Sequence, residues 1–544
     1  MSQKSEISIS KKNKIFLVLT IGAVSLLLKL YLVDFSVPET GDSWIYILRG
    51  LAHSEGDFSQ TPFKTSGWPL LLSTFYSFME SNAYIDYLNI ARITSIVIST
   101  ITIIPIYFLG KKFLNEKFSI VMTALFAFQP QLNYNSILGY SESLMIFVLV
   151  IAFYLLLNDK INKSVYISFI LLGFLWWIRI QGIIFILPFT ILYLIYYRKS
   201  KNVIKQYLVC LFIFFIVISP IMYERYNEYG NPFYYDGIFG EHAKEIFPSE
   251  ISPSLIFLEG IRNSFEALGT MLLPYLLFLF PLAFYFSLKL IPSEQKNYIG
   301  NWIFLIFSFL PFILFYFSGA SASRHLFHLY PFIIILSTMV IKKIIENKKI
   351  IFSKENQKII LCFTVGLILL SSILITYGID EFGYGRPNSQ KIHEIQEYGK
   401  FLIKNVNGNT LWSKGVDSDW IFVTLLQESE VSLKNYKINP HFDHTFDMIQ
   451  QFNPGNFYLF HKSHITGNSI EELVINGEKL ELKFISISSS NTDKFLDHVY
   501  ENEKKYPYLI KIFDSDESGF EYYNVKAFKI NYDIFSKLNP NLTK

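Results

Sequence analysis

Charged residues are scarce in this chain of 544 residues, at only 17% of the total. A soluble domain carries about 25% charged residues, so the deficit excludes an ordinary soluble protein. Hydrophobic residues, in contrast, make up 51% of the chain, and aromatic residues make up 17%. Over this length, such a composition indicates a polytopic membrane protein.

Cysteine is almost absent, since the chain contains only Cys210 and Cys362. Both lie inside apolar segments, so we expect buried thiols and exclude a disulfide framework. The chain also lacks a long basic block, and its formal net charge is only +3. These features argue against a nucleic-acid partner.

The N-terminal segment lacks the small-residue cleavage site of a signal peptide. Lys11, Lys12 and Lys14 precede an apolar run, which predicts an uncleaved first transmembrane helix. The chain also contains neither a low-complexity tract nor an internal repeat of about 20–50 residues.

Long apolar runs dominate the first two thirds of the chain. At roughly 20 apolar residues for each crossing, they predict about eleven transmembrane helices and a mainly α fold. The expected spans are 15–33, 91–109, 118–131, 142–158, 164–178, 181–197, 206–223, 268–290, 302–318, 325–341 and 359–377.

The basic residues between these runs predict one orientation. Lys111 with Lys112, the stretch 198–201, and Lys342 with Lys343 all fall on the side of the N-terminus. Because such clusters favour the cytoplasm, we expect a multi-pass cell-membrane protein with a cytoplasmic N-terminus. Residues after the last span are then extracytoplasmic.

The pattern of the chain changes after the last span. Residues 388–405 have helical spacing, whereas TLWSKG, NFYLFH, LKFISIS and YNVKAFKI resemble short strands. We therefore expect a soluble extracytoplasmic α/β or α+β domain over 379–544. The other predicted parts are a cytoplasmic tail, 1–14, and a transmembrane domain, 15–378, with an outer loop over 34–90.

The first outer loop contains the stretch VPETGDSWIYILRG. If this stretch is helical, Asp42 and Tyr46 share one face, and Trp44 and Tyr46 lie at headgroup depth. An acidic residue beside a membrane is a candidate for chemistry at the interface. The alternative is that Asp42 only caps a surface helix.

Two further charged residues border apolar runs. Glu142 opens the fourth expected span, where it is either functional or only a favourable partner of the helix dipole. Arg179, followed by Gln181, lies between the fifth and sixth spans. An arginine at a helix centre costs roughly 2.5–3.5 kcal/mol, so it favours a functional site, unless it reaches the interface.

Arg324 and His325 lie at the outer end of the tenth expected span. A guanidinium binds phosphate through two hydrogen bonds, and a histidine adds a further donor. The alternative is an ordinary solvated loop.

Other polar motifs lack the spacing of a metal site. Asp417-Ser418-Asp419 and the group His441, Asp443 and His444 are expected to be solvated surface. We therefore predict no metal ion. A glycosylation sequon begins at Asn541, on the expected outer side.

The order of these motifs resembles the GT-C superfamily of membrane glycosyltransferases, which use sugars on polyprenyl phosphates. The chain is most similar to the branch of protein O-mannosyltransferases and the lipid A aminoarabinose transferase. The resemblance covers about 15–340 and rests on Asp42 with Tyr46, Gly67-Trp68-Pro69, Ser141-Glu142, Arg179 with Gly182, and Arg324 with Pro331.

Two differences bear on the reaction. The branch often has Asp-Glu where this chain has Asp42-Ser43, and the WWDYG motif of oligosaccharyltransferases is missing around Asp419-Trp420. The missing motif favours transfer of a single sugar over transfer of a whole oligosaccharide.

The resemblance implies a dolichyl- or undecaprenyl-monophosphate sugar as donor, and a protein, lipid or glycan as acceptor. We expect an inverting reaction without a cofactor, in which Asp42 is the general base and Glu142 orients the acceptor or shares the base role. Arg324, Arg179, His325 and Lys64 are the candidates for the donor phosphate, and Tyr46, Trp44, Trp68 and Gln181 for the sugar or lipid.

Two other classes of function remain open. Intramembrane charges also mark transporters or flippases of lipid-linked sugars, although these commonly show two related halves, which this chain lacks. A non-catalytic scaffold would leave Asp42 and Arg324 unexplained.

Overall fold

The computed structural model contains two compact units. The first comprises Met1–Asp34, Asp57–Phe75 and Asn89–Gly385, and the second comprises Phe35–Gly56, Tyr76–Leu88 and Arg386–Lys544. The structure describes residues 11–39, 42–58, 65–81, 83–158, 163–234, 253–290, 296–315, 323–347, 363–373, 389–406, 408–413, 416–428, 459–461, 467–489 and 494–540.

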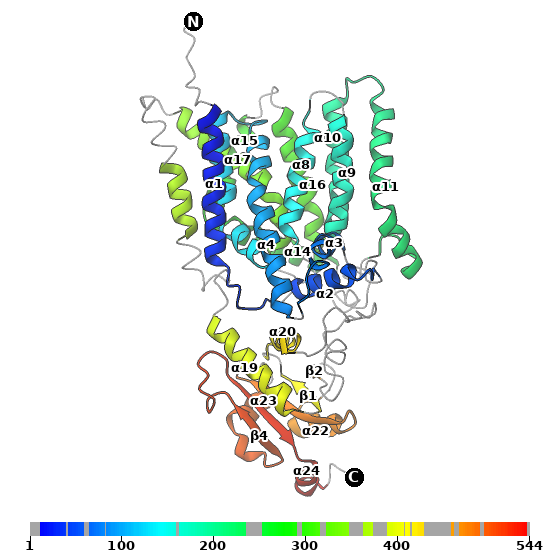
Figure 1. Cartoon of the computed structure of the whole chain (residues 1–544), viewed down its shortest axis with the longest axis vertical. Coiled ribbons are helices and arrows are strands. Elements are labelled where there is room, and N and C mark those ends of the chain that lie inside the picture. Colours follow the sequence, from blue (N-terminus) through cyan, green and yellow to red (C-terminus); the bar gives the residue numbers. More distant parts are fainter. Residues whose placement is uncertain are drawn as a thin grey trace. The chain divides into compact units, whose positions relative to one another are not determined.

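The first unit is helical, as the sequence predicts (Figure 1). Its elements are α1 (Lys11–Leu32), α3 (Gly67–Tyr76), α4 (Tyr84–Ile101, from Asn89), α5 (Ile103–Gly110), α6 (Glu116–Ala127), α7 (Pro130–Ile137), α8 (Glu142–Leu156), α9 (Lys163–Ile178), η1 (Ile180–Phe185), α10 (Ile186–Tyr197), α11 (Val203–Tyr229), α14 (Pro253–Leu272), α15 (Leu276–Leu290), α16 (Lys296–Phe315), η3 (Ser323–Leu329), α17 (Tyr330–Asn347) and the helix Phe363–Ile373. Helix α9 packs between α8 and α11.

Many of these helices have the length and composition of membrane spans. Within the described residues, 5 helices are long and apolar enough to cross a bilayer, or 6 if a bent pair forms one span. Three shorter apolar helices accompany them: Glu142–Leu156, Lys163–Ile178 and Phe363–Ile373. The expected number of about eleven spans stays a prediction.

The expected span over 268–290 falls on two helices with a sharp bend between them. Helix α14 ends at Leu272, α15 begins at Leu276, and the two meet at an angle of 114°. A break of this kind exposes backbone carbonyls, which need hydrogen-bond donors because a membrane interior supplies no water.

Side chains from α7 and α17 provide those donors. Gln129 Nε2 donates to the carbonyls of Met271, at 3.3 Å, and Leu273, at 2.8 Å. Gln131 donates to the Thr270 carbonyl, and the Tyr330 hydroxyl donates to Met271. The Tyr330 hydroxyl also lies 3.1 Å from Gln131 Oε1, so the polar network joins α7, the α14–α15 break and α17.

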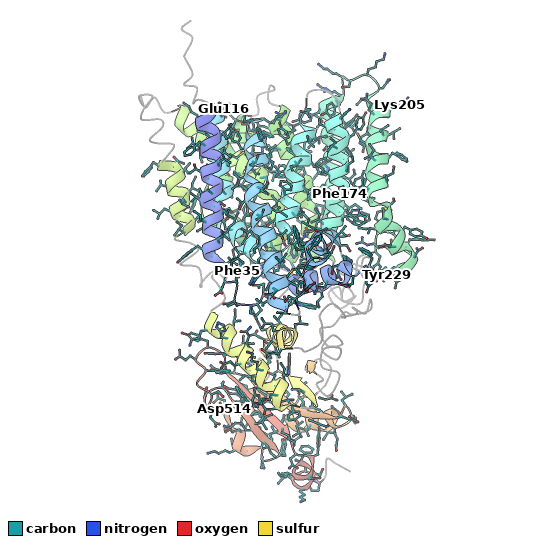
Figure 2. The ribbon with its side chains drawn as sticks, in the orientation of Figure 1. Phe35, Glu116, Phe174, Lys205, Tyr229 and Asp514 are labelled. Atoms are coloured by element: carbon teal, nitrogen blue, oxygen red, sulfur yellow. The ribbon has the colours of Figure 1, made fainter. Side chains whose placement is uncertain are left out.

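The two ends of the helical unit differ in their residues. Figure 2 shows Glu116 and Lys205 at the same end of the unit. Glu116 follows the turn with Lys111 and Lys112, and Lys205 follows the basic stretch 198–201. Tyr229, at the C-terminal end of α11, lies at the other end. Two of the basic clusters used to predict the orientation therefore share one end of this unit.

The second unit contains a five-stranded sheet in the order β2-β1-β3-β5-β4. Its strands are β1 (Asn409–Trp412), β2 (Leu459–His461), β3 (Leu482–Ser488), β4 (Leu509–Asp514) and β5 (Val525–Ile530). Strand β1 runs parallel to β2 and β3, whereas β5 is antiparallel to β3 and β4. The unit also contains α2 (Asp42–Ser54), α19 (Ser389–Asn405), α20 (Ser418–Glu428), α22 (Ile470–Glu478), η6 (Glu503–Lys505), α23 (Lys494–Glu501) and α24 (Tyr532–Leu538).

Helices cover both faces of this sheet. Ile485 and Ile487 of β3 pack with apolar residues of α22 and α23. Ser486 points to the opposite face, as alternation along a strand requires, and its hydroxyl bonds the Tyr398 hydroxyl of α19. The prediction of an α/β or α+β arrangement for this region is confirmed. The four expected strands and the expected helix are present, while β4 had escaped the pattern.

Candidate active site

Glu142 is the first residue of α8 and is 2% exposed. The chain turns into this helix at Gly139, whose φ of +79° favours glycine. An added Cβ at Gly139 would also lie 3.3 Å from the Ala91 side chain and the Arg92 backbone. The carboxylate thus stands at a helix N-terminus, where the helix dipole stabilises negative charge.

Arg179 lies in a tight connection between α9 and η1. Its backbone is extended, and the Gly182 N–H donates to its carbonyl at 2.8 Å. A Cβ on Gly182 would come within 2.3 Å of the Leu175 carbonyl carbon, so only glycine fits this turn. The close turn leaves the Arg179 side chain at the end of α9, where it is buried.

Glu142 and Arg179 form a buried ion pair. Arg179 Nη1 donates to Glu142 Oε1 at 2.5 Å and to Ser141 Oγ at 3.2 Å. The two side chains are only 3% and 9% exposed, so each depends on the other for its charge compensation. Within the described part of the chain, Glu142 Oε2 is buried and has no hydrogen-bond partner.

His325, on η3, completes the arrangement. Its Nδ1 lies 3.2 Å from Arg179 Nη2 and 3.3 Å from Gln181 Nε2. A guanidinium only donates, so Nδ1 is the acceptor in the contact with Arg179. The structure therefore brings four of the predicted site residues together, namely Glu142, Arg179, Gln181 and His325.

Arg324 lies beside this group. Its Cζ is 4.9 Å from the centre of the Tyr140 ring, a cation–π distance, and its side chain is partly exposed. Tyr140 had escaped the sequence analysis, although its place two residues before Glu142 was the available indication. Glu142, Arg179, Gln181, Arg324 and His325 are called the charged cluster below.

Gly67 and Trp68 begin α3. Gly67 lies against the backbone of Trp177 and Ile178, which leads into Arg179, and Trp68 contacts the backbone that leads into Glu142. Trp68 is 0% exposed and donates from its indole Nε1 to the Gly139 carbonyl at 2.9 Å. The expected contact of Trp68 with the sugar or lipid stays a prediction.

A family model described as dolichyl-phosphate-mannose-protein mannosyltransferase matches residues 85–223. The crystal structure of ArnT from Cupriavidus metallidurans bound to undecaprenyl phosphate is similar with a TM-score of 0.50 at 10% identity. That match covers 96% of this chain and 98% of ArnT. This chain has a GT-C fold.

A second solved structure supports the same fold. The Archaeoglobus fulgidus oligosaccharyltransferase in its apo form matches with a TM-score of 0.50 at 14% identity, over 89% of this chain and 70% of that chain. The comparison with curated proteins gave no match. The family model, over residues 85–223, indicates a glycosyltransferase, and together with the apolar helices it indicates an integral membrane protein. The two solved structures show the fold alone.

The family model covers Glu142, Arg179 and Gln181 of the charged cluster, whereas Arg324 and His325 lie outside the matched range. In the GT-C fold, the cluster is thus assembled from the matched helices and from a segment much later in the chain. The packing bridges 146 residues of sequence between Arg179 and His325.

Of the predicted residues in the first outer loop, Asp42, Trp44 and Tyr46 belong to the second unit, whereas Trp68 belongs to the first. The expected helix is present, because α2 begins at Asp42 and carries Trp44 and Tyr46. Asp42 is partly exposed, whereas Trp44 and Tyr46 are each 8% exposed. Lys64, the sequon at Asn541 and the group at His441 lie outside the described residues.

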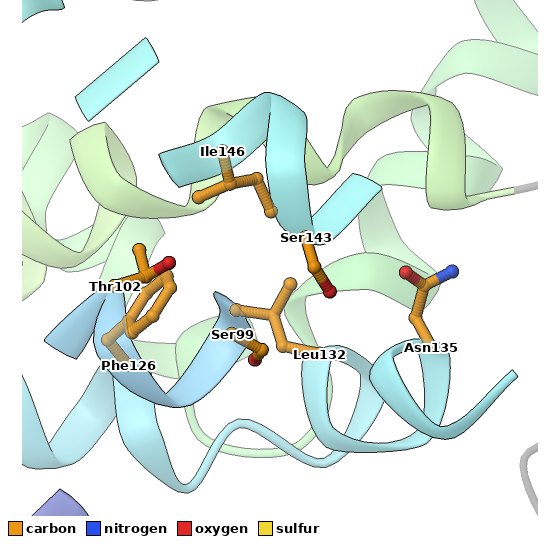
Figure 3. A pocket seen from close by; sticks show the side chains of 7 residues that line it. All are labelled: Ser99, Thr102, Phe126, Leu132, Asn135, Ser143 and Ile146. Carbon is orange, nitrogen blue, oxygen red and sulfur yellow. The ribbon is translucent and has the colours of Figure 1, made fainter. Parts of the chain in front are cut away.

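A small cavity lies between α4, α6, α7 and α8 (Figure 3). Its volume is about 10 Å³, enough for one water molecule and far too small for a sugar. Ser99, Asn135 and Ser143 line it, and Ser99 Oγ accepts a hydrogen bond from the buried Lys29 Nζ at 2.9 Å. Its lining does not include the charged cluster.

The described residues contain no group of three His, Cys, Asp or Glu side chains placed to hold a metal ion. Asp417, from the DxD-like motif, instead pairs with Lys391 at 3.4 Å, and both side chains are exposed. Metal independence of the reaction remains a prediction.

Proposed function

We propose that this chain transfers a single sugar from a polyprenyl monophosphate to an acceptor on the extracytoplasmic side of the membrane. The observation that carries the proposal is the buried Glu142–Arg179 pair, hydrogen-bonded onward to His325. Buried charges inside a membrane protein are costly and mark sites of function. The GT-C fold and the mannosyltransferase family model support the same activity.

The donor phosphate is the proposed partner of Arg324. Departure of the leaving group places negative charge on this phosphate, and fixed cations in a dry site stabilise that charge. Arg324 is partly exposed and lies over the Tyr140 ring, and a guanidinium has the planar donors that bind a phosphate through two hydrogen bonds. The ArnT structure contains undecaprenyl phosphate, which supports a polyprenyl phosphate here.

Arg179 and His325 have more indirect parts in the proposal. The charge of Arg179 is balanced by Glu142, so it contributes hydrogen bonds more than net charge. His325 accepts a hydrogen bond from Arg179 at Nδ1, and it is a proposed contact of the donor phosphate. Lys64 and Gln181 stay further candidates for contacts with the donor.

Asp42 is the proposed general base. It takes the proton of the acceptor hydroxyl, the acceptor oxygen bonds to the anomeric carbon, and the bond from that carbon to the phosphate oxygen breaks. The electron pair leaves with the polyprenyl phosphate, and the configuration of the sugar inverts. Glu142 orients the acceptor, while Trp44 and Tyr46 border the substrate.

The test is sugar transfer by the purified full chain from synthetic polyprenyl-phosphate mannose and glucose to acceptors in a membrane extract. Wild type should transfer sugar, whereas Asp42→Asn should lose about 10²–10⁴-fold, the usual contribution of a general base. Equal rates would exclude Asp42 as the base. NMR assigns the anomeric configuration of the product, and its comparison with that of the donor decides between inversion and retention.

Transfer of a whole oligosaccharide is the second candidate, because the fold is equally similar to the A. fulgidus oligosaccharyltransferase. Transfer from a diphosphate-linked oligosaccharide, without transfer from the monophosphate-linked sugar, would support this second candidate. Loss of activity in chelator, restored by Mn²⁺ or Mg²⁺, would contradict metal independence. Movement of a labelled lipid-linked sugar across proteoliposomes without transfer would favour the flippase.

A further inference from the structure

Gly67 lies in direct contact with the backbone that leads into Arg179. A Cβ added to Gly67 would lie 2.8 Å from both Ile178 N and the Trp177 carbonyl carbon. Real Cβ atoms do not approach backbone so closely, and backbone moves less easily than a side-chain tip. Only a glycine therefore allows α3 to begin against the end of α9.

The next residue, Trp68, contacts the backbone that leads into Glu142. Its buried indole Nε1 donates to the Gly139 carbonyl at 2.9 Å. Gly139 forms the turn before α8, and Glu142 follows three residues later. A single hydrogen bond thus links the first turn of α3 to the entry of α8.

Two adjacent residues consequently contact both segments that carry the buried ion pair. The pair itself depends on a distance of 2.5 Å between Arg179 Nη1 and Glu142 Oε1. A small shift of either backbone segment changes this distance and also the position of His325, which is hydrogen-bonded to Arg179 at 3.2 Å.

We infer that Gly67 and Trp68 are positioning residues that set the separation of the Glu142 and Arg179 segments, and through it the contacts among Glu142, Arg179 and His325. The inference rests on the proposed function for its effect on turnover. Neither residue needs to touch a substrate, in agreement with the complete burial of Trp68.

The competing explanation is that both residues only fill space in the helical unit. Space filling predicts an effect that adds to any change in the ion pair, because independent sites are additive. Positioning predicts non-additivity, because the contacts of Gly67 and Trp68 act through the pair. The two explanations therefore differ in a double-mutant cycle.

The experiment combines Trp68→Phe, which removes the indole N–H, and Gly67→Ala, which adds the Cβ, with Glu142→Asp in the full-length protein. Gly22→Ala is the matched control, because a Cβ on Gly22 of α1 meets nothing within 4 Å. Transfer from a synthetic polyprenyl-phosphate sugar and thermal unfolding in detergent are both measured.

In the wild-type background, we expect each variant to lower kcat by about tenfold or more, the scale of a misplaced catalytic group. The KM for the donor should change less than about twofold on the same reasoning, since the phosphate contact of Arg324 is retained. In the Glu142→Asp background, the same substitutions should lower kcat much less. Gly22→Ala should match its parent in both backgrounds.

Additive losses in kcat, or unchanged kcat in Trp68→Phe and Gly67→Ala, would overturn the inference. If wild type transfers no sugar from any donor, the proposed function fails, and the same cycle is read from the unfolding temperatures. Non-additive shifts there would still support positioning of the pair, and additive shifts would refute it.

Discussion

Arg179 and Glu142 lie 37 residues apart in the sequence, and their side chains meet at 2.5 Å inside the helical unit. The arginine follows α9 and the glutamate begins α8, so the pair joins the outgoing end of one helix to the incoming end of its neighbour. This contact ties fold stability and the proposed chemistry to the same two residues.

The buried pair predicts an asymmetry between single and double substitutions. Arg179→Met leaves the Glu142 carboxylate buried without its partner, which costs about 3–5 kcal/mol of unfolding free energy. Arg179→Met combined with Glu142→Leu removes both charges and should restore much of that stability. Denaturant or thermal unfolding of the purified protein measures the difference.

An exposed ion pair provides the control for this prediction. Lys400 and Glu428 are 3.1 Å apart, but their side chains are 57% and 42% exposed. Replacing either should change stability by less than about 1 kcal/mol. A double variant at Arg179 and Glu142 as unstable as the single variant would contradict the burial argument.

Arg324→Lys should weaken donor use more than it weakens folding. Lysine keeps the charge but loses the planar pair of donors that matches a phosphate, and it stacks less well on Tyr140. We expect a rise of the donor KM by about tenfold to a hundredfold, corresponding to one charge-assisted hydrogen bond of about 1.5–3 kcal/mol. Initial rates over a series of donor concentrations measure it.

The same variant also tests the assignment of Arg324 to the phosphate. An unchanged donor KM with a lower apparent affinity for the acceptor would move Arg324 to the acceptor side of the site. The unfolding temperature should stay close to that of wild type, since the Arg324 side chain is partly exposed.

Tyr330→Phe should destabilise the helical unit. Its hydroxyl donates to the Met271 carbonyl and lies 3.1 Å from both Gln131 Oε1 and Gln129 Nε2 at the α14–α15 break. Removing the hydroxyl leaves buried polar atoms with fewer hydrogen-bond partners, which lowers the unfolding free energy by about 1–3 kcal/mol. Thermal unfolding measures this effect, with the exposed Tyr226→Phe as a control that should stay close to wild type.

The sheet of the second unit contains a pH-sensitive ion network. Burial raises the pKa of Asp514, but the hydrogen bonds from Lys511 and from the Asp516 backbone outweigh it, so the pKa is lowered from 3.8. Hydrogen bonds to Asp514 and Glu517 raise the pKa of Lys511 above 10.5. Strands β4 and β5 carry Asp514, Lys511 and Lys526 of this network.

These shifts set the signs of the pH dependence. The Asp514 contribution to stability is present above pH 3.8 and is lost as the pH falls through its folded-state pKa. The Lys511 contribution is complete below pH 10.5 and is lost at still higher pH. A fluorophore on Ile510→Cys in the full chain, after replacement of the native cysteines, should report acid unfolding of the sheet.

Asp514→Asn is the control for this titration. It should lower stability at neutral pH and flatten the pH dependence below pH 3.8, where the lowered pKa of the Asp514 carboxyl acts. An unchanged slope would assign the acid sensitivity to other carboxylates.

Local sequence patterns were sufficient for much of the fold. The helix that begins at Asp42, the helix over 388–405, and four of the five strands follow from period and composition. The bend at Leu273 does not, because apolar residues continue through it. Its carbonyls are satisfied by Gln129 and Gln131, which lie more than a hundred residues earlier.

The sequence by itself determined the chemistry that is available: a mainly helical membrane protein with few charges, where Glu142, Arg179, Arg324 and His325 border apolar runs. Only the tertiary structure decided their partners. It paired Glu142 with Arg179, made His325 an acceptor of Arg179 at Nδ1, and enclosed Trp68 against Gly139. Periodicity describes the faces of one element, whereas these contacts join elements far apart in the chain, so packing alone selects them.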